Sequence, residues 1–364
     1  MQQTLALTFD ALGIKVSRGD SVTLPTITAQ YEHEWGYRLL IKLPSGVSSA
    51  DVIKQQRAIS EALRADIEAY WKNGLVIDVF TRKLPAKVLY VAEKRNDWKV
   101  PIGVNRRGET RYFDFAGPFP HLLTGGIAGG GKSVISRGII TSLVLGDRTD
   151  LYLCDLKGGV ELGMFRNFRC TLGFADNLQK VAELAERAER EMNGRYAIMA
   201  ANGSQDWHGR RLVFVMDEMA DLKTRPGDPE ADVKNRIKSV LTRISAKGRA
   251  AGVILMLSTQ RPSADVIDGL IKTNIATSIS FKTRDGTQSR IIIDSTDAAD
   301  LPDIPGRCIY QQQNDEILQT FLLSYEDAKK LLANCEMKTE ENVNDVNESQ
   351  PGESLAAYGN ITVL

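Results

Sequence analysis

The chain has 364 residues, which at roughly 100 to 200 residues per domain is enough for about two domains with a sizeable core. Apolar residues make up 43% of the chain and charged residues 25%, which excludes a disordered or fibrous protein. The 46 basic and 46 acidic side chains cancel, so the chain lacks a generally basic character, and any contact with nucleic acid must come from particular positions.

The distribution of cysteine, histidine and apolar residues narrows the class further. The four cysteines form no CxxC pair and the three histidines are isolated, which argues against a zinc site or a disulfide framework. The first residues lack the basic start and apolar run of a signal peptide, and no stretch approaches the roughly 18 apolar residues of a membrane span. We therefore expect a cytoplasmic protein with reduced cysteines.

Residues 1–105 are predicted to form a small α/β domain. An apolar run over 37–43 predicts a strand, Ser48 or Ser49 can then cap a helix, and 75–80 predicts a second strand. The expected helix has four apolar residues on one face, namely Val52, Ile59, Leu63 and Ile67. Since no motif with a known chemistry falls in this region, we expect a structural or assembly role for it.

The polar segment 92–117 is interpreted as a boundary, and a second domain is predicted over 106–335. A helix is predicted over 178–192, with its charged side opposite an apolar stripe and exposed to solvent. The predicted strands of this domain are 151–154, 212–216, 253–257 and 277–281. Their alternation with helices predicts a mostly parallel sheet. Residues 336–364 are rich in Asn, Glu, Ser and Gly, and we expect a flexible tail there.

A phosphate-binding loop is the strongest local signal in the sequence. The eight residues from Gly126 to Ser133 (GIAGGGKS) fit G-x-x-x-x-G-K-[ST], between a predicted strand end at 121–123 and a predicted helix over 134–145. Glycines allow backbone N–H groups to turn toward phosphate oxygens. Lys132 is predicted to reach the β- and γ-phosphates of ATP, and Ser133 to bind Mg²⁺. The predicted ATP contacts are Gly126, Ile127, Ala128, Gly129, Gly130, Gly131, Lys132, Ser133 and Val134.

An acidic pair follows an apolar strand further along. Residues 212–216 end in Asp217-Glu218, as expected for a buried parallel strand that presents carboxylates at its carboxyl end. Taken alone, such a pair is also compatible with an exposed strand end. Together with the upstream phosphate loop, it predicts that Asp217 holds the Mg²⁺ shell and that Glu218 is the general base for the attacking water.

Four separated blocks resemble the motor domain of the FtsK/SpoIIIE family of DNA translocases over about residues 113 to 325. They are HLLTGGIAGGGKS, DLKGGVEL at 155–162, VMDEMADL at 215–222, and GRAAGVILMLSTQRPSADVIDGLIKTNIATSISF at 248–281. The resemblance implies a RecA-like P-loop fold, ATP hydrolysis with Mg²⁺, and a ring of like subunits, most commonly six, that moves double-stranded DNA.

The resemblance also implies roles for residues that their surroundings leave open. Arg249 corresponds to an arginine finger that reaches the nucleotide of a neighbouring subunit, whereas by itself it could be a surface charge. Gln260 corresponds to a sensor of the γ-phosphate, whereas by itself it could be a strand-end hydrogen bond. The DNA contacts implied by matching basic positions in pore-facing loops are Arg261, Lys272, Arg284 and Arg290.

Several departures from the family pattern are visible. Gly286 stands where the family commonly has a lysine, with Lys282 and Arg284 slightly earlier, and 223–232 reads as a short insertion. Membrane spans and the winged-helix module of chromosome pumps are not found in the sequence. These features favour a plasmid, phage or integrative-element motor, whose membrane or relaxase partner the sequence does not identify.

Two other functions remain compatible with the sequence. The motors of specialised protein secretion share this fold, although they usually carry several motor domains and a membrane anchor. In a third alternative, ATP only switches a DNA-binding regulator between assembly states.

Overall fold

The computed structural model describes residues 1–93, 95, 97–267 and 269–338, which form two compact units. Residues 1–84 and 106–109 make up the first unit, and residues from 85–105 and from 110 onward make up the second. Residues 85–105, which we assigned to the N-terminal domain, thus pack with the second unit. Most of the expected tail, 339–364, lies outside the described residues, but Met337 bridges to Phe168 in an antiparallel manner.

The first unit contains a four-stranded antiparallel sheet in the order β3-β4-β6-β5. Its elements are α1 (Gln2–Ala11), β1 (Val16–Arg18), β2 (Ser21–Thr23), β3 (Thr26–His33), β4 (Gly36–Lys42), α2 (Ser49–Lys54), α3 (Gln56–Leu63), β5 (Asp66–Trp71) and β6 (Leu75–Phe80). Ser48 caps α2 in a capping box with Asp51. The single helix that we expected is wrong at its end, because Arg64 takes a left-handed conformation and Ile67 belongs to β5.

A buried ion cluster covers one face of this sheet. Asp78 is fully buried in β6 and pairs with Arg38 at 2.8 Å and with Arg107 at 2.6 Å. Burial raises the pKa of Asp78, but hydrogen bonds from the two guanidinium groups outweigh it and hold that pKa below its usual value. A buried carboxylate without a partner would destabilise the fold. The two arginines therefore allow Asp78 to remain charged within the sheet.

The second unit is built on an 11-stranded sheet within the described residues. Its main order is β12-β11-β13-β14-β10-β15-β16-β17-β8-β9. The strands from β12 to β15 along this order are parallel, and those beyond β15 pair antiparallel. The strands are β7 (Val88–Leu89), β8 (Lys99–Asn105), β9 (Thr110–Asp114), β10 (Leu122–Gly125), β11 (Thr149–Cys154), β12 (Thr171–Ala175), β13 (Arg211–Met216), β14 (Val253–Thr259), β15 (Thr277–Phe281), β16 (Arg307–Gln311) and β17 (Asp315–Leu322). The segment 92–117, expected as a polar boundary, contains the β8–β9 hairpin instead.

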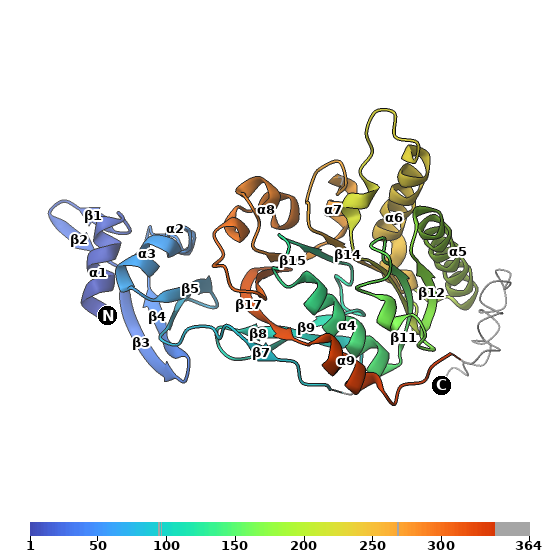
Figure 1. The fold of residues 1–364 in the computed structure, drawn as a ribbon. Coiled ribbons are helices and arrows are strands. Elements are labelled where there is room, and N and C mark those ends of the chain that lie inside the picture. The colour runs from blue at the N-terminus through green and yellow to red at the C-terminus, as the bar shows by residue number, and fades with distance from the viewer. Residues whose placement is uncertain (94, 96, 268, 339–364) are drawn as a thin grey trace. The chain divides into compact units, whose positions relative to one another are not determined.

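Helices cover both faces of this sheet (Figure 1). They are α4 (Lys132–Gly146), η1 (Gly163–Phe165), α5 (Leu178–Asn202), η2 (Met219–Leu222), α6 (Ala231–Ala251), α7 (Gly269–Asn274), α8 (Gly286–Ile293), η3 (Asp297–Ala299) and α9 (Tyr325–Leu332). Alternate strand residues point to opposite faces: Val213 and Val215 join the core under α4, while Phe214 joins the core under α5 and α6. This explains why 212–216 is apolar throughout, and the predicted α/β class with a mostly parallel sheet is confirmed.

Candidate nucleotide site

The phosphate loop lies between β10 and α4, where the sequence predicts it. Gly126 and Gly131 have φ values of +140° and +124°, a region that disfavours side chains. A Cβ on Gly126 would lie 2.7 Å from Cβ of Phe281, and one on Gly131 would lie 2.9 Å from Cε1 of the same ring. The loop backbone is held by two hydrogen bonds, Ile127 N–H to Lys282 O at 2.9 Å and Gly306 N–H to Gly130 O at 2.8 Å. The glycines are therefore required by packing as well as by phosphate chemistry.

Lys132 is the first residue of α4 and its side chain turns back over the loop. Its ammonium group donates to the carbonyls of Gly126 and Ile127, each at 2.6 Å. Burial lowers its pKa to about 8, although the Glu218 carboxylate pulls in the opposite direction. An ammonium group at the helix N-terminus and inside the loop is placed to meet phosphate oxygens.

The acidic pair follows β13 directly and is almost fully buried. Asp217 Oδ2 lies 3.0 Å from the Lys157 ammonium, and Glu218 Oε2 lies 3.7 Å from the same group. Burial raises the pKa of Asp217, and the charge of Lys157 opposes that shift. The alternative of an exposed strand end does not describe the structure, since Asp217 and Glu218 are only 6% and 7% exposed.

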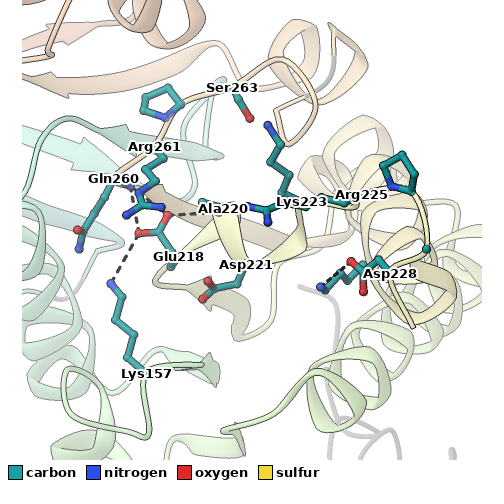
Figure 2. Close-up of a pocket in the computed structure, with 14 residues that line it drawn as sticks. Lys157, Glu218, Ala220, Asp221, Lys223, Arg225, Asp228, Gln260, Arg261 and Ser263 are labelled. Atoms are coloured by element: carbon teal, nitrogen blue, oxygen red, sulfur yellow. Dashed lines mark hydrogen bonds and ion pairs between the residues drawn. The ribbon is translucent and has the colours of Figure 1, made fainter. Parts of the chain in front are cut away.

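Glu218 is fixed by donors from two elements (Figure 2). Its Oε1 accepts hydrogen bonds from the Thr259 hydroxyl at 2.9 Å, the Gln260 N–H at 3.0 Å and the Ala220 N–H at 3.2 Å. Thr259 ends β14, which lies between β13 and β10 in the sheet. The neighbouring strand ends thus orient the carboxylate that we predicted as the general base.

A cavity of about 960 Å³ opens beside Glu218. Its lining residues are Lys157, Glu218, Ala220, Asp221, Lys223, Arg225, Pro226, Gly227, Asp228, Lys234, Gln260, Arg261, Pro262 and Ser263. The segment 223–232, which reads as an insertion, therefore supplies part of the cavity wall. A polar cavity next to an oriented carboxylate provides room for an attacking water molecule and for groups from outside the chain.

The residues present fit a magnesium nucleotide. The Lys157 ammonium already occupies a cation position against Asp217, which indicates that this carboxylate suits a positive ion. Oxygen donors from a hydroxyl and a carboxylate, here Ser133 and Asp217, are the type that Mg²⁺ prefers. The glycines of the loop put no side chain between its backbone and a phosphate group.

Arg249 and Gln260 lie at opposite ends of β14. Gln260 follows the strand at its carboxyl end, where its N–H bonds Glu218. Arg249 is exposed near the end of α6 and precedes β14. Since β14 has seven residues and a strand rises about 3.3 Å per residue, roughly 20 Å separates Arg249 from the phosphate loop of its own chain. Within one chain the structure does not bring Arg249 to the site.

The predicted DNA contacts differ in their surroundings. Arg261, Arg284 and Arg290 are exposed, and the first two follow the carboxyl ends of β14 and β15, which flank β10. Lys272 is only 17% exposed in its side chain, donates to the carbonyl of Ile292 and lies 3.4 Å from Asp294. The geometry therefore gives Lys272 an internal role that the sequence pattern did not indicate.

The sequence did not indicate several residues that hold the phosphate loop and the acidic pair in place. Phe281 and Gly306 pack on the phosphate loop, and Thr259 holds Glu218. Asp155 is fully buried and accepts N–H bonds from Lys157, Glu161 and Leu162, which shapes the loop that carries Lys157. An aspartate directly after an apolar strand was a visible signal for this loop.

Residues 87–211 match the model of the FtsK/SpoIIIE family, which includes the phosphate loop and ends before the acidic pair. The large unit thus contains a segment that is similar to the ATPase domain of the FtsK/SpoIIIE family. The DNA translocase FtsK of Lactococcus lactis subsp. cremoris is 29% identical over 331 residues, which cover 81% of this chain and 41% of that protein. The chain thus spans about two fifths of the length of this relative.

Solved structures confirm the RecA-like fold of the large unit. The pCW3 conjugation coupling protein TcpA, in a monomer form with ATPγS, superposes with a TM-score of 0.64 at 24% identity, covering 91% of this chain and 98% of TcpA. The cytoplasmic domain of the type VII secretion ATPase EccC of Thermomonospora curvata gives a TM-score of 0.53 at 22% identity, covering 68% and 33% of the two chains. In the described part of the chain, no helix combines the length and apolar character needed to cross a bilayer.

Proposed function

We propose that this chain hydrolyses ATP with Mg²⁺ to move double-stranded DNA in the cytoplasm, as a ring of like subunits, most simply a hexamer. One observation carries the proposal: the buried carboxylate of Glu218 is oriented by hydrogen bonds at the same edge of the sheet as a complete phosphate loop. Glu218 also lines a cavity of about 960 Å³. The similarity to FtsK translocases and to a conjugation coupling protein supports DNA as the substrate and DNA transfer between elements or cells as the setting.

The roles of the residues follow from their positions. Lys132 and the loop N–H groups would hold phosphate, Ser133 and Asp217 would hold Mg²⁺, and Glu218 would accept a proton from the attacking water. When bound, the metal nucleotide supplies the phosphoryl group and the charge that the site is shaped to receive. The Thr259 hydroxyl and the Gln260 N–H keep the Glu218 carboxylate aimed while it acts.

Arg249 supports a ring rather than a monomer. Its distance of roughly 20 Å from the phosphate loop of its own chain supports a contribution to the site of another copy. Interfaces that repeat head to tail in this manner close into a ring when the rotation between neighbouring subunits divides a full turn. The exposed Arg261 and Arg284 would contact DNA phosphates, which gives grip without reading sequence.

The test is the ATPase rate and its dependence on DNA. We expect duplex DNA of any sequence to stimulate turnover, and binding to weaken steeply with salt because contacts are made to phosphates. Arg261→Ala and Arg284→Ala should each reduce the slope of log K against log salt by roughly one unit, whereas Arg243→Ala, on an exposed helix face paired with Glu189, should leave it unchanged. Stimulation by no DNA, or only by one defined sequence, would contradict the proposal.

A secretion motor is the second candidate, favoured by the fold shared with EccC. In that case an unfolded or extended protein substrate, and not DNA, would raise the ATPase rate. A switch-type regulator would respond strongly to neither.

A further inference from the structure

The loop after β11 places a positive charge directly on the acidic pair. Lys157 Nζ lies 3.0 Å from Asp217 Oδ2 and 3.7 Å from Glu218 Oε2. Figure 2 shows its side chain rising toward Glu218 from the loop below. Neither composition nor the motif chemistry assigned a role to this lysine.

The backbone around Lys157 is held in place by strand pairing and by hydrogen bonds. Strands β11 and β13 are parallel neighbours with Cys154 opposite Met216, so the segments that follow them leave the sheet side by side. Asp217 N–H donates to Cys154 O at 3.1 Å, which ties the two strand ends together. The buried Asp155 accepts three backbone N–H groups of the next seven residues, at 2.9 to 3.1 Å, and so fixes the turn that carries Lys157.

The charge balance of the site depends on this lysine. Asp217 and Glu218 are adjacent, nearly buried carboxylates, and two such charges repel each other unless a cation lies near. Lys132 is directed to the loop carbonyls instead. Lys157 is thus the cation that pairs with both carboxylates in the described structure.

Magnesium and Lys157 require the same carboxylate. A Mg²⁺ shell that involves Asp217 and an ammonium group 3.0 Å from Asp217 cannot coexist without strong repulsion between the two cations. The lysine has space to leave, because its side chain is 37% exposed and borders the cavity of about 960 Å³.

We infer that Lys157 is a positioning residue of the ATPase site, which holds Asp217 and Glu218 in place before nucleotide binds and is displaced from Asp217 when Mg²⁺ arrives with the nucleotide. This inference rests on the proposed function, since it takes Asp217 as the residue that holds the metal. It predicts that Mg²⁺ replaces the Lys157 ammonium at Asp217. The lysine then raises the Mg²⁺ concentration at which half of the sites are occupied.

The experiment measures binding of a fluorescent ADP analogue to the full chain as Mg²⁺ is titrated from an EDTA-treated start. We expect Lys157→Met to lower the Mg²⁺ midpoint by about tenfold, because the competing charge is gone. Lys157→Arg keeps the charge and should retain a midpoint near that of the wild type. Lys223→Met is the matched control: Lys223 lines the same cavity but pairs with Asp265, so its loss should leave the midpoint unchanged.

Thermal unfolding without nucleotide gives a second readout. Lys157→Met should lower the Tm by several degrees, since it leaves two buried carboxylates without their cation, and the added change Asp217→Asn should restore most of the loss. If Lys157→Met alone does not fold, the proposal requires the double variant to fold.

Two results would overturn the inference: an Mg²⁺ midpoint that stays the same or rises in Lys157→Met, or a double variant no more stable than Lys157→Met. Failure of the proposed function looks different: an ATPase rate that duplex DNA does not stimulate would contradict DNA movement and would leave the Mg²⁺ titration unaffected. If Asp217 does not hold the metal, the wild type itself would bind the analogue without any dependence on Mg²⁺.

Discussion

The two ends of the parallel strands in the large unit use polar residues in different ways. At the carboxyl ends, Lys157 pairs with Asp217 and Glu218 beside a cavity, and Lys132 donates to the carbonyls of the phosphate loop. At the amino ends, buried polar side chains satisfy the backbone: Arg195 donates to the carbonyls of Ala251 and Gly252 at 3.1 and 3.0 Å. The first arrangement leaves charge available for a ligand, and the second uses it to end a helix.

Arg249 is the exception at the amino ends. It is exposed, and its carbonyl rather than its guanidinium group takes part in the helix end. Arg195 and Arg249 both lie near the end of α6, but only Arg195 is buried. Burial therefore distinguishes the structural arginine, Arg195, from the candidate catalytic arginine, Arg249.

The largest expected effect tests this exception. Arg249→Ala should reduce turnover by about 10³ to 10⁵, the effect of an arginine finger in other P-loop enzymes, with nucleotide affinity and folding retained. Steady-state ATPase rates measure the loss, and Arg243→Ala on the same helix is the control.

Mixing variants shows whether Arg249 acts in trans. Subunits with Arg249→Ala keep an intact phosphate loop, and subunits with Lys132→Ala keep the arginine, so a mixture should regain part of the activity. A rate near that of the wild type for Arg249→Ala alone would exclude the finger role. Mixed rings without any activity would mean that Arg249 acts in its own chain or that turnover needs an unbroken ring.

The second effect separates two residues at the carboxyl ends. Glu218→Gln should slow hydrolysis by roughly 10² to 10⁴ while ATP still binds, because the amide cannot take the proton of water. Lys132→Ala should instead lose nucleotide binding or turnover, since it removes the charge in the phosphate loop. Equilibrium binding and single-turnover hydrolysis distinguish the two defects, and rapid hydrolysis by Glu218→Gln would rule it out as the base.

The smallest effect concerns the amino ends and depends on pH. His121 is buried, its Nδ1 accepts the Leu255 N–H at 3.0 Å, and burial lowers its pKa to about 4, with a smaller contribution from Arg249. The unfolded chain takes up a proton near pH 6.5 and the folded chain only near pH 4. The stability is therefore complete above pH 6.5 and falls as the pH drops, by roughly 3 kcal/mol in total.

A conservative variant checks the assignment to His121. His121→Asn keeps an acceptor for the Leu255 N–H but does not titrate, so its free energy of unfolding should fall less between pH 6.5 and 4 than that of the wild type. His208 is exposed, and His208→Asn should retain the wild-type pH dependence. Equal slopes for His121→Asn and the wild type would contradict the prediction.

The sequence predicted the parts of the fold that depend on local pattern. The apolar run before Asp217 and the glycines before Lys132 carry their signals within ten residues, and both elements lie where they were expected. The break at Arg64 and the β8–β9 hairpin were missed, because a left-handed residue without glycine and a strand that contains Pro101 and Gly103 have weak local signals.

The contacts that complete the site could not be predicted from the pattern alone. Phe281 touches the phosphate loop only because β15 pairs with β10, and Thr259 reaches Glu218 only because β14 lies beside β13. Strand order fixes both contacts, and strand order is a property of the whole sheet. Lys272 is a different case: the sequence pattern indicates a DNA contact, but in the structure its side chain is mostly buried and pairs with Asp294.

The hydrogen bond from Gly306 to Gly130 has a practical consequence. The Gly306 amide can exchange its proton with solvent only when that bond opens, while its carbonyl stays bonded to the Thr320 N–H at 2.9 Å. Hydrogen–deuterium exchange at this single backbone position therefore records how often the phosphate loop detaches from the antiparallel half of the sheet. The Gly306 amide proton thus reports that motion in the unmodified chain, and no probe has to be attached near the nucleotide.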